Sequence, residues 1–194
     1  MESVLFPIHP EPCSYIVQGI KEWEFRTRPP KIETPYKGYI YCTGGRLLYE
    51  NYPHGDKSRE IKLADYRYAK QSHALNGKVI GEFICDRTVE VVRNGFVNPF
   101  AINSQVLEKG HLSNSEFLEY TDHYRKDLYA LHISQLVIYD KPKELTEFKR
   151  PSNRASCGIK DCGFYSSRRC LIGGNCDKLT IRKAPQSWCR VVAL

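Results

Sequence analysis

The charged side chains most able to carry chemistry lie between residues 4 and 28. His9 follows an apolar run, and Lys21, Glu24 and Arg26 come soon after it. A lysine acts as a base or nucleophile only where burial or a neighbouring cation lowers its pKa. Beside Glu24, Lys21 could instead form an ion pair or contact a phosphate. We take Lys21 and Glu24 as candidate catalytic residues and all four as candidate ligand contacts.

Local patterns place these side chains in a strand–helix–strand unit. The apolar run at residues 4–8 predicts a short buried strand, and Pro10 suits the first turn of a helix. Gly19 suits the left-handed residue that ends this helix. Residues 21–28 then alternate between charged and aromatic, which predicts a second strand. We expect this unit to bring the charged side chains together, with Trp23 and Phe25 in the core.

Residues 151–183 are small, polar and basic, and carry four cysteines: Cys157, Cys162, Cys170 and Cys176. Such a segment has too little apolar surface to order itself. Four thiolates around a tetrahedral zinc ion would order it, and they would leave no open position for catalysis. The spacing lacks a tight C-x2-C knuckle, so free thiols or a disulfide pair remain alternatives. The flanking basic residues either solvate a poor core or bind phosphate.

Four later residues are further candidates for ligand binding. Tyr129, His132 and Ser134 fall at alternating or near-alternating positions of one predicted strand, and Trp188 lies on the last predicted strand. A histidine there could donate a proton, although a hydrogen-bonded core histidine is the commoner outcome. Trp188 could stack on a base, or be buried in the core.

The pattern of an apolar strand, a proline, a short helix and G-x-K-x-x-E-x-R resembles the signature of the ASCH domain, a relative of the PUA, EVE and YTH domains. In this chain the motif reads GIKEWEFR over residues 19–26. The segments LYALHISQLVIYDKPKELTEFKRP (128–151) and APQSWCRV (184–191) are similar to ASCH proteins of bacteria and their phages. The three together cover most of the chain.

The resemblance implies a PUA-like β-barrel. It also implies a role for Lys21, because ASCH-type amidohydrolases are thought to use a lysine at the matching position for catalysis. Glu24 stands where the small amidohydrolase members carry threonine. In the YTH relatives an aromatic cage recognises a modified base.

Periodicity along the rest of the chain predicts an α+β fold. We expect strands at residues 37–43, 78–92, 128–139 and 186–192, with a bulge near 134–135, and helices near 61–74 and 113–124. Residues 44–60 are polar and predict a surface loop. The best fit is a small mixed or antiparallel barrel with two or three flanking helices. We divide the chain into a barrel (1–150), a cysteine-rich insertion (151–183) and a final barrel strand (184–194).

Composition bounds the setting of the protein. The chain has 194 residues, 41% apolar and 26% charged, which is ordinary for a globular protein. Its formal net charge of +7 is consistent with a polyanionic partner. No apolar run approaches membrane-spanning length and the N-terminus lacks a signal pattern, so we expect a cytoplasmic protein with no membrane partner and reduced thiols.

Three hypotheses of function follow. The favoured one is a module that binds a nucleic acid, with RNA ahead of DNA, or a modified nucleoside, in a basic cleft. The second is a hydrolase that acts through Lys21, either as an N4-acetylcytidine amidohydrolase or as a ribonuclease. The third is a protein-interaction adaptor whose contact is the cysteine-rich segment. A single sequence leaves the oligomeric state open.

Overall fold

The protein is described by a computed structural model, which covers residues 1–51, 59–64, 74–103, 105–151, 165–166, 169–170 and 176–194. Its first unit is the predicted strand–helix–strand: β1 (Ser3–Ile8), α1 (Pro10–Val17) and β2 (Trp23–Arg26). Pro10 opens α1, and Gly19 lies just beyond its end with a left-handed φ of 71°. The local sequence pattern of this unit is therefore confirmed.

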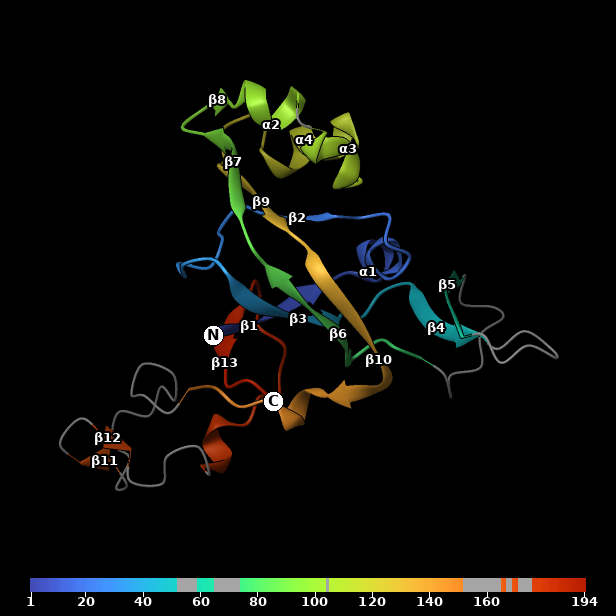
Figure 1. Cartoon of the computed structure of the whole chain (residues 1–194), viewed down its shortest axis with the longest axis vertical. Helices are drawn as coiled ribbons and strands as arrows, with labels where there is room; N and C mark the ends of the chain where they lie inside the picture. The colour runs from blue at the N-terminus through green and yellow to red at the C-terminus, as the bar shows by residue number, and fades with distance from the viewer. Residues whose placement is uncertain (52–58, 65–73, 104, 152–164, 167–168, 171–175) are drawn as a thin grey trace.

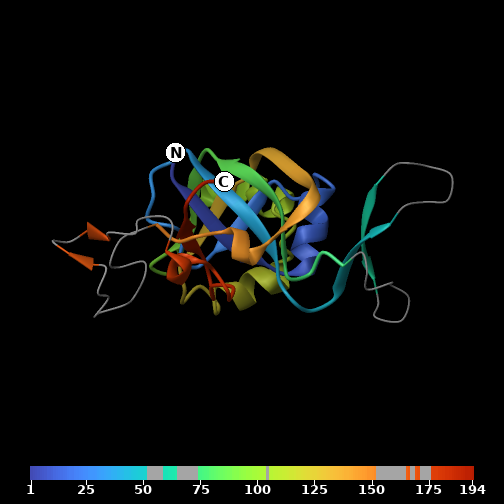
Figure 2. The ribbon, with the colours of Figure 1, turned by 90° about the horizontal axis from the view of Figure 1, so that it is seen from below.

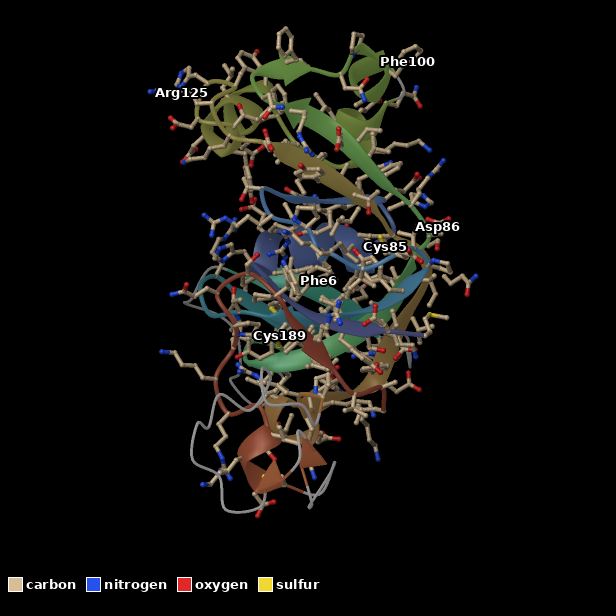
Figure 3. The ribbon with its side chains drawn as sticks, turned by 90° about the vertical axis from the view of Figure 1, so that its left-hand side faces the viewer. Phe6, Cys85, Asp86, Phe100, Arg125 and Cys189 are labelled. Carbon is tan, nitrogen blue, oxygen red and sulfur yellow. The ribbon has the colours of Figure 1, made fainter. Side chains whose placement is uncertain are left out.

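The larger sheet has five strands in the order β10-β6-β3-β1-β13. Its other members are β3 (Tyr36–Cys42), β6 (Lys78–Cys85), β10 (Ser134–Glu144) and β13 (Cys189–Val191). β1 and β3 run parallel, while the remaining pairs are antiparallel, so the sheet is mixed. Figure 3 shows β13, with Cys189, crossing close to β1.

A second sheet has the order β2-β9-β7-β8, with β7 (Thr88–Arg93), β8 (Phe96–Val97) and β9 (Leu128–His132). The chain passes from one sheet to the other twice, from β6 into β7 and from β9 into β10 (Figure 1). The predicted bulge is confirmed, because the β10–β6 register shifts after Ser134 and Gln135 has a φ of 47°. The α+β class and mixed pairing are confirmed, while the described strands form separate open sheets rather than one closed barrel.

Helices pack outside the sheets. α2 (Pro99–Asn103), α3 (Val106–Lys109) and α4 (Asn114–Tyr120) gather at one end, over the second sheet (Figure 1). The predicted capping box of α4 is confirmed, since Ser113 and Glu116 bond each other's backbone amides. The region before α4 was predicted to be irregular, and it contains the short strand β8 and the two short helices α2 and α3.

Two predictions between residues 44 and 74 are wrong where the structure describes them. β4 (Leu47–Asn51) lies within the predicted loop, and β5 (Glu60–Ala64) stands where a helix was predicted to begin. The two strands pair with each other as an antiparallel hairpin (Figure 2). Leu48 is fully buried in the main core, and Leu63 packs against that core, so tertiary burial decides the conformation of a mostly polar segment. Residues 65–73 of the predicted helix lie outside the described part.

Candidate functional site

A pocket of about 420 Å³ lies beside the first unit. Four parts of the chain line it: the end of β1 with the start of α1, strand β2 with the residues around it, the segment from His111 through α4, and the stretch 184–187 before β13. Small-ligand pockets typically measure about 300–1,000 Å³, so this one has room for a ligand of nucleoside size.

The floor of the pocket holds three of the predicted residues as one buried ionic cluster. Lys21 and Glu24 are each only 6% exposed. The Glu24 carboxylate lies 3.7 Å from Lys21 Nζ and 2.9 Å from Arg26 Nη2. The structure therefore brings Lys21, Glu24 and Arg26 together, with both cations on one carboxylate.

Lys21 is held by the backbone as well as by Glu24. Its Nζ donates to the carbonyl of Gly110 at 2.5 Å, and it lies 5.0 Å from the centre of the Phe25 ring. Burial lowers the pKa of Lys21 below its ordinary value, and Arg26 acts in the same direction, whereas Glu24 and Glu116 oppose the shift. A lowered pKa makes the neutral amine more accessible, as a lysine base requires.

Arg26 ties the pocket walls to the floor. Its Nη2 donates to Pro7 at 2.9 Å and its Nη1 to Ser187 at 3.1 Å, both through backbone carbonyls. Its Nε is buried and has no hydrogen-bond partner within the described part of the chain. Because an unpaired buried donor costs about 1–3 kcal/mol, this N–H is a ready contact for an acceptor on a ligand.

The last of the four, His9, also lines the pocket. It lies between β1 and α1, where its Nδ1 is 3.2 Å from the hydroxyl of Thr43. All four charged residues of the first unit therefore reach one site, as their spacing predicted.

Three further pocket residues were not found from the sequence. His111 stacks on Tyr15 with ring centres 4.0 Å apart, and Glu116 and Tyr120 face the pocket from α4. Hydrogen bonds from Ser113 hold the pKa of Glu116 below its ordinary value, so this carboxylate is ionised at neutral pH. The capping box marked Glu116 in the sequence, but only as a helix signal.

The other predicted ligand contacts do not line this pocket. Tyr129 pairs in register with Arg26, but its hydroxyl accepts a hydrogen bond from Arg93 at 2.6 Å. Ser134 donates to the backbone of Ile84. Trp188 packs partly buried against the main core, and its Nε1 donates to the carbonyl of Arg28 at 2.8 Å.

His132 forms a separate pair on the protein surface. Its Nδ1 is 2.6 Å from a carboxylate oxygen of Asp86, and its ring lies 4.7 Å from that of Trp23. Cys85 and Asp86 lie at the turn between β6 and β7 (Figure 3). Trp23 and Phe25 are buried in the second core cluster, as predicted.

The zinc prediction falls largely outside the described residues. Cys157 and Cys162 lie there, Cys170 is described only as part of the short strand β12 (Arg169–Cys170), and Cys176 is a buried free thiol. Within the described part of the chain no group of three or more histidine, cysteine or acidic side chains could hold a metal ion. A zinc site formed by the four cysteines stays a prediction. Among the described helices, none is long and apolar enough to span a bilayer.

The lowered pKa of Lys21 predicts the sign of a pH effect on stability. The folded state binds this proton more weakly than the unfolded state, whose pKa is near 10.4. Between the two pKa values the unfolded chain carries more protons, so stability gained from Lys21 rises with pH. We expect the free energy of unfolding of the native protein, minus that of Lys21→Met, to increase from about pH 8 to about pH 10 in urea titrations. A difference that falls over this range would contradict the placement of Lys21.

Comparison with known proteins gives structural neighbours only. No family model matches the chain, and no curated protein matches it. The fold is similar to the crystal structure of ASCH from Zymomonas mobilis, with 20% identity, 74% of this chain and 73% of that chain covered, and a TM-score of 0.47. Two single-residue variants of that protein give 16% and 18% identity, cover 75% and 74% of this chain and 77% and 74% of theirs, with TM-scores of 0.45 and 0.46. The family that these structures name, ASCH, is the one that the motifs of the first unit resemble.

Proposed function

We propose that this chain binds nucleic acid, RNA ahead of DNA, by taking one nucleoside into the pocket beside β2. The observation that carries the proposal is the buried Lys21–Glu24–Arg26 cluster on the floor of a cavity of about 420 Å³. Sequence-specific recognition of RNA usually targets unstacked bases, whose edges are read by hydrogen bonds in pockets of this kind.

The polar groups of the floor suit the edge of a base. Glu24 offers an acceptor for an amino or imino N–H, and the unpaired Nε of Arg26 offers a donor beside it. Pro7, Pro12 and the half-exposed ring of Tyr120 supply apolar wall surface. Adjacent donor and acceptor groups between apolar walls match a planar ligand with both kinds of edge atom.

Binding tests this proposal directly. We expect a fluorescent single-stranded RNA to bind at about 50 mM salt and to weaken at about 200 mM, because phosphate contacts release counterions. Glu24→Gln should weaken binding about 10–100-fold, the loss expected for one hydrogen bond to a charged group. Glu82→Gln is the matched control, since Glu82 is also a partly buried carboxylate paired with a lysine, Lys37 at 2.6 Å, but lies outside the pocket.

Either of two results would reject the proposal. The first is an absence of RNA and DNA binding at low salt by a protein that thermal unfolding shows to be folded. The second is equal binding by the native protein and Glu24→Gln, because the floor would then not touch the ligand.

A second candidate function is hydrolysis in the same pocket, favoured by the lowered pKa of Lys21 next to Glu24. A neutral Lys21 would take a proton from water as the water attacks the acyl carbonyl of N4-acetylcytidine, releasing acetate and cytidine. Turnover of that nucleoside or of labelled RNA, lost in Lys21→Ala, would raise this candidate above binding alone. Binding without turnover would leave the first.

A further inference from the structure

Two segments far apart in the sequence run side by side at the mouth of the pocket: residues 26–31, which follow from β2, and residues 182–190, which lead into β13. Three hydrogen bonds to backbone carbonyls join them, from Arg26 to Ser187 at 3.1 Å, from Trp188 to Arg28 at 2.8 Å and from Arg190 to Lys31 at 3.2 Å. The bonds run in the same order along both segments, so the two are fixed alongside each other.

These segments are rich in cations and contain no Asp or Glu. Arg26 is used in the pocket floor, and Arg190 pairs with Glu2 at 2.9 Å. The four remaining cations, which we call the basic ridge, are all exposed and have no ion pair with any described carboxylate: Arg28, Lys31, Arg182 and Lys183.

Other exposed cations of the protein are neutralised. Arg93 pairs with Glu90 at 2.8 Å, and Lys109 pairs with Glu22 at 2.9 Å. The basic ridge is therefore a local excess of positive charge, and not a sample of an evenly basic surface. Such an excess attracts a polyanion and gains free energy by releasing its counterions.

The basic ridge adjoins the pocket along the chain. Thr27, next to Arg28, lines the pocket, and so do residues 184–187, which follow Lys183 directly. A strand with one nucleotide in the pocket would therefore meet these cations with its neighbouring phosphates.

We propose that the basic ridge binds the phosphates of a single-stranded nucleic acid whose one unstacked nucleotide occupies the pocket. This inference rests on the proposed function and adds the path of the strand outside the pocket. The partner is single-stranded because a base held in the pocket cannot remain stacked in a duplex.

A pair of charge-matched variants tests the ridge. The ridge variant is Arg28→Gln/Lys31→Gln/Lys183→Gln, and the control is Arg125→Gln/Lys126→Gln/Lys141→Gln. Each loses three positive charges from exposed side chains, so the net charge of both falls equally. Arg125 lies at the end of the molecule formed by α4, well separated from Cys189 and the second segment (Figure 3).

The measurement is the affinity for a fluorescent single-stranded RNA of mixed sequence over a salt series. Each single-strand phosphate contact contributes about 0.7 to the slope of log K against log salt, so the ridge variant should lose about 2 from the slope. The same contacts correspond to about 100-fold weaker binding at about 0.1 M salt. The control should bind like the native protein, and both variants should bind a free nucleoside as the native protein does.

The outcomes separate the ridge from the pocket. Equal RNA affinity and slope in the ridge variant and the control would overturn the ridge and leave the pocket standing, provided that Glu24→Gln still weakens binding. Inorganic polyphosphate that binds as tightly as RNA, and is lost in the ridge variant, would overturn the nucleic-acid strand as the partner. Native protein that binds neither RNA nor nucleoside would reject the proposed function itself.

Discussion

Replacing Glu24 with leucine is expected to lower the free energy of unfolding by about 3–5 kcal/mol, because the change leaves two buried cations without their shared carboxylate. Lys21 would retain only the carbonyl of Gly110, and Arg26 would retain the carbonyls of Pro7 and Ser187. Urea unfolding followed by circular dichroism measures the loss.

An exposed ion pair of equal length provides the control. Glu2 and Arg190 are also 2.9 Å apart, but their side chains are 51% and 47% exposed. Exposed pairs contribute about 0–1 kcal/mol, so Glu2→Leu should have a small effect. Equal costs for Glu24→Leu and Glu2→Leu would show that burial does not govern the pocket cluster.

The double variant Lys21→Met/Glu24→Leu should recover much of the loss. Replacing a buried ion pair with apolar side chains of similar volume is often neutral or stabilising, whereas removing one partner is costly. Arg26 keeps its two carbonyl acceptors in both backgrounds. The same double variant should lose the ligand, because both the acceptor and the ammonium are gone. Recovery of stability without recovery of binding would identify the cluster as functional and not merely structural.

The part of the site that was predicted from the sequence depends on local order. Lys21, Glu24 and Arg26 lie within six residues of one another, so strand alternation alone places Glu24 and Arg26 on one side of β2. His111 and Tyr120 enter the pocket from a helical region about ninety residues later in the chain. No local period relates that region to β2, because only tertiary packing sets their distance.

Strand pairing also explains the wrong assignment of Tyr129 to the cleft. A predicted strand has two faces but no named neighbours, and the neighbours decide where a long side chain ends. Tyr129 is opposite Arg26 on one side and opposite Glu90 on the other. Arg93, which pairs with Glu90, binds the hydroxyl and draws the ring over β7, away from the pocket. His132 is similarly held outside the pocket by Asp86, which lies on a turn whose position the sequence did not give.

Gly110→Ala is expected to destabilise the protein by about 1–3 kcal/mol, the usual cost of inserting atoms into a packed core. A Cβ at residue 110 would lie 2.7 Å from the carbonyl oxygen of Val106 and would overlap the ring of Phe25. Phe25 is 4% exposed and packed in the second core cluster, so its ring has little room to move.

The position of Gly110 makes the same change a test of the site. Its carbonyl accepts the 2.5 Å bond from Lys21, so a displaced backbone would move the ammonium away from Glu24. We therefore expect weaker RNA binding in Gly110→Ala even at temperatures where the variant is fully folded. Gly44→Ala is the control, because a Cβ at residue 44 would meet no atom within 4 Å.

A smaller residue at position 25 should relieve the overlap. In the Gly110→Ala background, Phe25→Leu should cost less than it does in the native protein, because the lost ring volume accommodates the new Cβ. The two substitutions would then show a favourable coupling energy in a double-mutant cycle measured by urea unfolding. Simple additivity would mean that Gly110 and Phe25 do not touch, and that the backbone support of Lys21 is not set by this contact.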